Sequence, residues 1–534
     1  MKWLCCFWLA LLVIQGNAFA ENRELRFCLR SEPKTFNPIL VNDDASETIR
    51  YLTGGVLVRI NRLTQKAEPE LAASWKISLG GRRIHFNLRS GMRFSDGTPF
   101  SADDVAYTMR QLMDPKLHTT TGDAFRSGQG TVDVRVLSPA SVEITFPAPV
   151  ANLVNLFDTV AIVSAKSPQK EGAVLGPFFI AEHKPGAYIL LKRNVHYWKK
   201  DSAGNSLPYL DAIRLDIEPN REIEALRYSR GEVDLINDVD ALTYEKLSEL
   251  NPALVRDVGP STDTEELWFN QVTTAPIPEY RRAWFRSVYF QRALSEAINR
   301  EDLARIVFRG HAVPAVDMVP PSNKFWFNAN LNQHRYDPDA ALRMLEQDGF
   351  RLENGILRDR AGNQVEFSII TNAGNRAREN MAAMIQQDWK KIGINVNVVT
   401  LDFSSLIERI TQTYTYEACL LGTVNGDLDP NSQMDVWLSS GEDHIWNPKQ
   451  KAPASEWEAE IDRLMRAQAS AANQQKRRMY WNRVQEIVRE EEPLLYLVHK
   501  DALVAISPAV KNAEPSVFRP QTYWNVEQLT LSHQ

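Results

Sequence analysis

Signals for strands and signals for helices alternate along the whole chain, and this alternation limits the fold more than any other feature. Residues 83–89 alternate strictly between polar and apolar side chains, which predicts a strand with one buried face. An Asp-Gly turn follows, and then Ser101 and Asp104 have the spacing of a capping box at the start of a helix. A strand and a helix are therefore expected in close succession.

The same alternation continues in the second half of the chain. Asp337 is a suitable helix cap, Pro338 suits the first helical position, and Gly349 is expected to end that helix. Further patterns predict a helix over 381–392, a strand over 394–398, a helix after Ser455, a helix over 480–488 and a strand over 494–498. Strands interleaved with helices predict a mixed α/β architecture.

The first twenty residues have the features of a secretory signal peptide. Lys2 precedes a continuous apolar run from Leu4 to Ile14, and Ala18-Phe19-Ala20 has the small-x-small pattern of a cleavage site. We predict cleavage before Glu21 and therefore an exported, periplasmic protein. The alternative is a short membrane anchor, which the length of the run disfavours, because about 20 apolar residues are needed to span a bilayer.

Export places the two cysteines beyond the predicted leader where a disulfide could form. Cys28 and Cys419 lie nearly the whole chain apart, each within an apolar, strand-like stretch. A buried free cysteine packs as a small hydrophobic residue. We therefore expect two free thiols.

Charge and motifs exclude several functional classes. The 534 residues carry a formal net charge of -6, whereas a nucleic-acid-binding protein needs a basic face. No phosphate-binding loop, dinucleotide fingerprint, nucleophile elbow or paired zinc-ligand motif occurs, and no two of the nine histidines have helical ligand spacing. We therefore expect no cofactor, no resident metal and no catalytic residue of a recognisable kind.

One long stretch resembles a known family. Residues 71–115 read LAASWKISLGGRRIHFNLRSGMRFSDGTPFSADDVAYTMRQLMDP, which is similar to the signature region of the family 5 extracellular solute-binding proteins. Further segments resemble landmarks of that family in the same order. They are 31–38, 176–178, 191–198, 290–300, 336–338 and 389–394.

The resemblance implies the two-lobed type II periplasmic-binding-protein fold with an extra domain in the first lobe. After a signal peptide at 1–20, the first lobe is expected over 21–264 plus 500–534, with the extra domain at 53–170. The second lobe is expected over 265–499, and two strands crossing between the lobes would form a hinge.

The same resemblance implies a receptor that captures a peptide or similar small polar solute and delivers it to the membrane permease of an ABC importer. A two-state hinge would close over the solute, and no bond would be made or broken. We expect a monomer that binds no nucleic acid.

Peptide-binding members of the family hold the ligand ammonium with an aspartate in a segment that here reads Leu421-Gly-Thr-Val-Asn-Gly-Asp-Leu-Asp-Pro430. Counted back from Pro430, the family's position falls on Gly426, so Asp427 is one residue off, and the preceding tryptophan is missing. Asp427 is the first candidate for a cation partner, against a loop aspartate that only caps a turn. Asn425 in the same stretch is a second candidate.

Four further residues are candidates for the cleft. Trp446 follows the same segment, and Trp268 and Asn270 begin the expected second lobe. Packing in the core is the alternative for the tryptophans, because most of the thirteen in the chain must be internal. Asn37 lies near the expected rim of the first lobe, although Asn-Pro is also a common turn.

Two other functions remain open on the sequence. One is an exported hydrolase acting on peptides or glycans, with a catalytic site assembled from distant residues. The other is a signalling or chaperone-like receptor on the same fold, which hands its ligand to a sensor instead of a permease.

Overall fold

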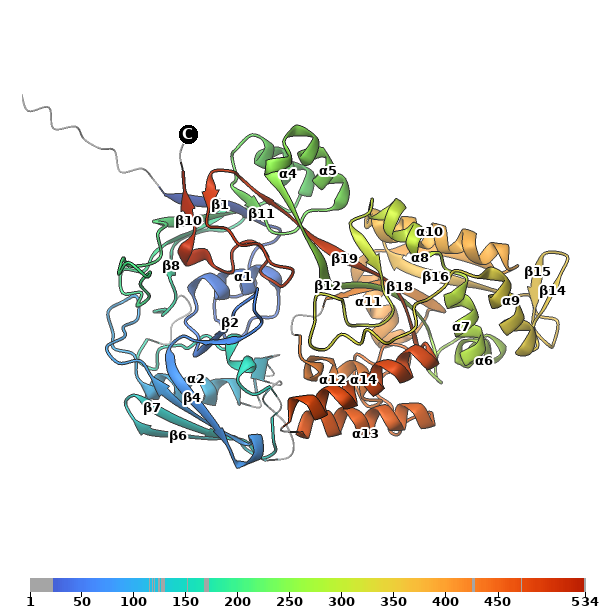
Figure 1. Cartoon of the computed structure of the whole chain (residues 1–534), viewed down its shortest axis with the longest axis horizontal. Coiled ribbons are helices and arrows are strands. Elements are labelled where there is room, and N and C mark those ends of the chain that lie inside the picture. The colour runs from blue at the N-terminus through green and yellow to red at the C-terminus, as the bar shows by residue number, and fades with distance from the viewer. Residues whose placement is uncertain are drawn as a thin grey trace, which may run out of the picture.

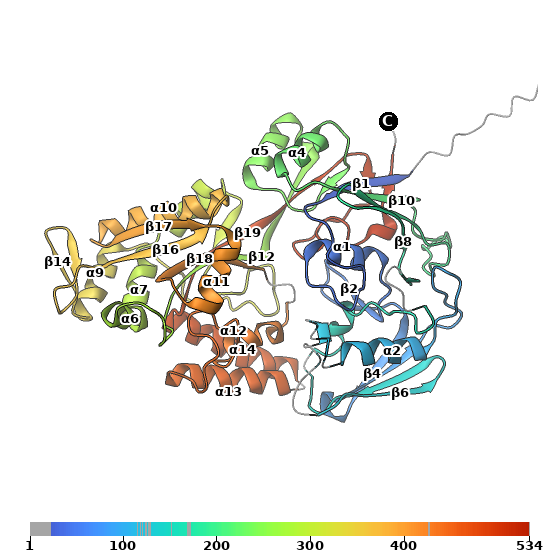
Figure 2. The ribbon, with the colours of Figure 1, turned by 180° about the vertical axis from the view of Figure 1, so that it is seen from behind.

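The computed structural model describes residues 23–532 except 115, 118, 120, 123–124, 126–129, 151, 168–171, 425–427 and 472. The predicted signal peptide lies outside the described residues. Two lobes lie side by side, joined by long strands (Figures 1 and 2). Helices and strands are interleaved throughout, as the sequence predicts. Within the described part of the chain, every helix is too short or too polar to cross a membrane.

The first lobe is built on a four-stranded sheet in the order β1-β10-β9-β8. β1 and β10 are parallel, and the other pairs are antiparallel. Helix α1 begins after its cap Asp43. The bounds of these elements are β1 Glu24–Leu29, α1 Asp44–Thr53, β8 Phe178–Lys184, β9 Tyr188–Arg193 and β10 Ala212–Ile217. Helices α4 (Arg221–Ser229) and α5 (Ala241–Leu250) and strand β11 (Leu235–Ile236) follow.

Both ends of the described chain contribute to the core of this lobe. Leu25 of β1 packs in one apolar cluster with Val526 and Leu529, near the C-terminus, and all three are buried. The C-terminal segment also forms a small hairpin, β20 (Val510–Lys511) with β21 (Thr530–Leu531). The first lobe is therefore discontinuous in sequence.

A separate sheet with its own core occupies one end of the first lobe (Figure 1). Its strands, in the order β4-β5-β7-β6, are β4 Ala72–Ser78, β5 Arg83–Leu88, β6 Asp133–Ser138 and β7 Ser141–Thr145, with a hairpin of β2 (Val58–Ile60) and β3 (Ala67–Pro69) nearby. The predicted strand at 83–89 is confirmed, with alternate side chains buried. Helix α2 (Ala102–Leu112) begins with the predicted capping box of Ser101 and Asp104.

The second lobe is built on a seven-stranded sheet in the order β11-β19-β12-β18-β16-β17, with β13 also paired to β19. The edge strand β11 lies in the first lobe, where it pairs with the end of β19. The other strands are β12 Val255–Phe269, β13 Ala312–Pro314, β16 Glu366–Asn372, β17 Asn395–Leu401, β18 Ala418–Val424 and β19 Leu494–Ile506. Successive side chains of a strand point to opposite faces. In β12, Leu267 and Phe269 accordingly enter one apolar core and Trp268 the other.

Helices cover both faces of this sheet. The core containing Phe269 also takes side chains from α6 (Glu279–Arg286), α7 (Val288–Glu296), α9 (Pro338–Gln347) and α10 (Arg376–Lys391). The core containing Trp268 takes side chains from α11 (Phe403–Glu408), α12 (Met434–Trp437), α13 (Glu456–Ser470) and α14 (Gln474–Glu491). The short helix α8 (Arg300–Asp302) and the hairpin of β14 (Arg351–Glu353) with β15 (Ile356–Arg358) complete the lobe.

The predicted signals of the second half are confirmed. Asp337 caps α9, and Gly349 follows it with a φ of 93°, a value that favours glycine. Ser455 and Glu458 form the capping box of α13. The strand predicted at 494–498 is part of β19, which continues to Ile506.

The two cysteines beyond the predicted leader are free thiols, as expected. Cys28 is half-buried on β1 in the first lobe, and Cys419 is fully buried on β18 in the second. Burial raises the pKa of the Cys28 thiol to about 12, with a further contribution from Glu224. Both thiols are therefore held in the neutral form.

Candidate functional site

Two long antiparallel strands, β12 and β19, connect the lobes and cross the space between them (Figure 1). Their pairing is irregular in the middle, with register shifts between Asp257 and Pro260 and between Pro260 and Thr264. Gly259 has a φ of 96° within this stretch. A disrupted ladder places fewer restraints on the backbone, and hinges are made of a few such residues. We call residues 258–263 and 500–502 the hinge.

Five charged side chains gather at the second-lobe side of the hinge, and we call them the hinge charge cluster. They are Asp263, Glu265, Arg378, Lys500 and Arg519. They come from β12, α10, β19 and the C-terminal segment of the first lobe. The cluster therefore links the crossing strands to both lobes.

Glu265 is the buried centre of this cluster. Its side chain is 2% exposed, Arg378 Nε donates to its Oε2 at 2.7 Å, and Lys500 Nζ lies 3.4 Å from its Oε1. Burial alone would raise the pKa of Glu265, but Lys500 and Arg378 together hold it below its ordinary value. Glu265 is therefore ionised at neutral pH.

Asp263 and Lys500 form the more open part of the cluster. Lys500 Nζ lies 3.7 Å from Asp263 Oδ2, and Arg519 Nη2 donates to the same oxygen at 3.4 Å. The Lys500 side chain is 31% exposed and that of Arg519 36%. Burial would lower the pKa of Lys500, but Glu265 and Asp263 raise it above its ordinary value. Two cations are therefore partly open to solvent here.

Gly422 makes room for the buried ion pair. It lies opposite Glu265 in the pairing of β12 with β18. A Cβ at this position would lie 2.5 Å from Arg378 Nη2 and 2.7 Å from Glu265 Oε2, closer than real contacts allow. The pair can therefore lie directly over the β18 backbone only because residue 422 has no side chain.

A second buried ion pair lies near the same end of β18. Arg477 of α14 makes two hydrogen bonds to Asp429, one of 2.8 Å from Nη1 to Oδ2 and one of 2.5 Å from Nη2 to Oδ1. Asp429 also lines a small hollow of about 20 Å³ together with Thr262, Asn323 and Trp481. That volume has room for about one water molecule.

The candidates Asn425 and Asp427 lie outside the described residues. β18 ends at Val424, whose backbone is opposite Asp263, and the described chain resumes at Leu428. The carbonyl of Leu428 accepts a hydrogen bond from Asn323 Nδ2 at 3.0 Å. Both ends of the segment that carries the two candidates are thus close to residues that border the hinge.

The structure places Trp446, Trp268 and Asn270 in the interior of the second lobe. The two tryptophan side chains are 0% and 1% exposed and pack in the same apolar cluster. Asn270 Nδ2 donates to the carbonyls of Tyr414 and Tyr416. In this conformation these side chains offer no surface to a solute, and their contacts are those of a core.

Asn37 is half-buried in the first lobe and stabilises a turn. Its Oδ1 accepts from the backbone N–H of Ile39 at 3.0 Å, and its own N–H donates to Thr35 Oγ1. Asn37 therefore has the turn role that its Asn-Pro context indicates.

Sequence patterns missed the hinge charge cluster. Part of the signal was present, because Lys500 lies in a short polar stretch of β19 between two apolar runs, and a buried charge needs a partner. Glu265 and Arg378 are distant in sequence from Lys500 and from each other, so only the fold shows that the three meet.

Comparisons with known proteins identify the family. The family model for bacterial extracellular solute-binding proteins, family 5, matches residues 66–444. A dipeptide-binding protein of Pseudomonas aeruginosa is 25% identical over 97% of this chain and 98% of its own length.

Solved structures show the same fold. The oligopeptide-binding protein AppA of Bacillus subtilis, in complex with a nonapeptide, has a TM-score of 0.74 at 22% identity, covering 96% of this chain and 99% of its own. NikA of Brucella suis, in complex with Fe(III)-EDTA, has a TM-score of 0.80 at 20% identity, covering 95% and 100%. The predicted two-lobed type II fold is therefore confirmed.

Proposed function

Because this chain belongs to the bacterial extracellular solute-binding proteins of family 5, which serve ABC importers as substrate-binding receptors, we propose that it binds a short peptide or similar small polar solute between its lobes. The family match over residues 66–444 is the observation that carries the receptor role. The hinge charge cluster supports the choice of solute.

Lys500 provides a contact for the carboxylate of such a solute. Its Nζ lies 3.4 Å from Glu265 and 3.7 Å from Asp263, which is longer than a direct hydrogen bond. The ammonium therefore keeps donors for a ligand while the two carboxylates keep it charged. Glu265 itself is too deeply buried to contact a solute.

Asp427 is our candidate for the ammonium of the peptide. It belongs to the segment between Val424 and Leu428, whose two described ends are close to the hinge. A buried ammonium requires a carboxylate, because an unpaired charge in a closed cleft is costly. Asn425 in the same segment would accept or donate one further hydrogen bond to the peptide backbone.

Binding would act through the hinge. A solute that touches both lobes binds the closed form better than the open one, and it shifts the population by that difference in affinity. To change the ratio of closed to open molecules from 1:99 to 99:1, the solute must bind the closed form about 10⁴-fold more tightly than the open form. The permease would then recognise the closed, loaded receptor.

Native mass spectrometry of the tag-free protein, followed by calorimetric titration with di- to pentapeptides, tests this proposal. The expected result is one bound peptide per chain and a more compact scattering profile with the peptide. Lys500→Met should weaken the binding of peptides with a free C-terminal carboxylate more than the binding of C-terminally amidated peptides. Equal scattering with and without a saturating peptide would contradict closure, and equal losses for both peptide types would remove Lys500 from the site.

We also propose that the chain carries out no chemistry on its solute. The family consists of transport proteins, which supports this proposal. Incubation with a peptide library should leave every peptide intact at any protein concentration. Cleavage at catalytic amounts of protein would instead favour the hydrolase alternative.

The proposed location is the periplasm, after cleavage before Glu21. The family's extracellular character and the pattern of the first twenty residues support it. The intact mass of the exported protein should correspond to a chain that starts at Glu21. A mass that retains the apolar leader would contradict cleavage.

A further inference from the structure

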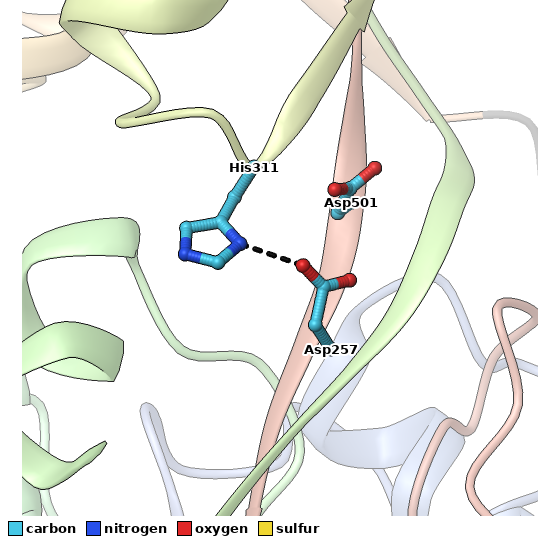
Figure 3. A group of neighbouring side chains, drawn as sticks. All are labelled: Asp257, His311 and Asp501. Atoms are coloured by element: carbon cyan, nitrogen blue, oxygen red, sulfur yellow. Dashed lines mark hydrogen bonds and ion pairs between the residues drawn. The ribbon is translucent and has the colours of Figure 1, made fainter.

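Three side chains with metal-binding chemistry meet at the first-lobe side of the hinge. Asp257 belongs to β12, Asp501 to β19, and His311 immediately precedes β13 (Figure 3). One ligand atom from each lies within 4.8 Å of the other two. The three residues come from three separate strands or loops, so the fold rather than local sequence brings them together.

The contacts within this group are incomplete. His311 Nδ1 lies 2.6 Å from Asp257 Oδ2 (Figure 3). The backbone N–H of Asp501 donates to the His311 carbonyl at 3.1 Å. Asp501 Oδ1, in contrast, is buried and accepts no hydrogen bond from any residue that the structure describes. No described lysine or arginine forms an ion pair with Asp501.

The two carboxylates are close and carry like charge. Two neighbouring carboxylates repel each other unless a proton or a cation lies between them. Because no described lysine or arginine forms an ion pair with either carboxylate, a bound cation would supply the positive charge that this group lacks.

We propose that Asp257, His311 and Asp501 form a binding site for a divalent transition-metal ion at the hinge. An imidazole nitrogen with two carboxylates suits zinc or a similar ion, whereas calcium and magnesium prefer sites made of oxygen alone. Ligand atoms no more than 4.8 Å apart need to move by only about 1 Å to reach metal–ligand distances of 2.0–2.2 Å. Water would complete the coordination.

Because these three residues lie at the hinge, the ion would stabilise the hinge and would not be the transported solute. Asp501 follows Lys500 in β19, and successive side chains of a strand point to opposite faces. The side chains of Asp501 and Lys500 are therefore expected to point away from each other, so that the ion would not compete with Lys500 for Glu265. A bound ion would tie β12 and β19 to the segment before β13, next to Tyr244 of α5, whose ring packs against His311.

Calorimetric titration of the tag-free, chelator-treated protein with zinc, manganese, calcium and magnesium chlorides tests the site. We expect one zinc ion per chain and no binding of calcium or magnesium at the same concentrations. His311→Ala and Asp501→Asn should each weaken zinc binding at least about 10-fold. The absorption spectrum of bound cobalt should change when His311 is replaced.

A matched control is available in the first lobe. His183 also contacts a carboxylate, Glu32, and belongs to no group of three metal ligands among the described residues. His183→Gln should leave zinc affinity unchanged. The proposal is wrong if the wild type binds no zinc, if His311→Ala binds it unchanged, or if His183→Gln loses as much affinity.

Two further measurements show whether a loss of zinc affinity comes from the missing ligand or from misfolding of the variant. Far-ultraviolet circular dichroism of each variant without metal should match the wild type, and Asp501→Asn, which removes a like charge, should not lower the unfolding temperature. Peptide affinity, measured without metal, should be the same in the wild type and in His311→Ala. If the wild type binds peptide but no zinc, only the metal site is contradicted. If it binds zinc but no peptide, only the proposed function is contradicted.

Discussion

Replacing Arg378 with methionine tests whether the buried ion pair supports the second lobe. The change keeps most of the aliphatic volume but removes the two hydrogen bonds to Glu265 and a third, of 2.9 Å, to Asn372. Removing one partner of a buried pair typically costs about 3–5 kcal/mol, because the other charge is left unpaired. Lys500 remains 3.4 Å from Glu265, so we expect the lower part of this range.

The stability loss caused by Arg378→Met should depend on pH, and the pKa of Glu265 determines the direction. In the wild type the pKa of Glu265 is below its ordinary value, so this carboxylate contributes stability above the unfolded-state pKa and loses it as the pH falls through the folded pKa. Without Arg378, burial should raise the pKa of Glu265. The stability difference between variant and wild type should therefore shrink as the pH is lowered from 7.5 towards 5.

Urea unfolding followed by tryptophan fluorescence measures this difference, because several of the buried tryptophans lie in the second lobe. Combining Arg378→Met with Glu265→Gln should recover part of the lost stability, since no unpaired charge remains. Arg483→Met is the control and should cost less than about 1 kcal/mol, because Arg483 and its partners Glu460, Glu486 and Glu490 are all partly open to solvent. A loss that is independent of pH, or a double variant with additive losses, would refute this reasoning.

Three further predictions can be tested with single variants or a labelling reagent. Gly422→Ala should destabilise the protein by about 1–3 kcal/mol, as overpacking does, because the new Cβ meets the ends of the paired Arg378 and Glu265 side chains at 2.5 and 2.7 Å. An unchanged urea midpoint would contradict this contact. Asp427→Asn should weaken the binding of peptides with a free N-terminus by roughly 1–3 kcal/mol in calorimetric titration and leave the binding of N-acetylated peptides unchanged. An equal effect of the substitution on both kinds of peptide would remove Asp427 from the site. A thiol reagent should label both Cys28 and Cys419 in the unfolded chain. In the native state Cys419 should stay unlabelled because it is fully buried, in contrast to the half-buried Cys28. Rapid labelling of Cys419 in the native protein would contradict its position.

Features set by nearby residues were predictable from the sequence. The capping boxes of Ser101 with Asp104 and of Ser455 with Glu458 form as expected, because each depends on residues three positions apart. The strand predicted at 494–498 illustrates the limit. It continues to Ile506 because its backbone pairs with β12, β13 and β11, which come from distant parts of the chain and which a local pattern does not show.

The candidate site depends on which side chains are exposed, and sequence patterns do not give that. Trp446 was placed at the cleft by its position in the sequence, yet its side chain packs against Trp437 and Trp457 in the core. Sequence position does not decide exposure for a residue type that is buried in most contexts. The carboxylates and imidazole of the proposed metal site were missed for a similar reason, because Asp257, His311 and Asp501 have no ligand spacing along the chain.

The discontinuity of the first lobe has a consequence for how the protein matures. Leu25 shares its apolar core with Val526 and Leu529, which follow it by about 500 residues and are therefore synthesised much later. The second lobe, by contrast, is one uninterrupted stretch between the two connecting strands. The first lobe therefore cannot complete its core until residues 526–529 have been synthesised, whereas the second lobe can complete its own core earlier.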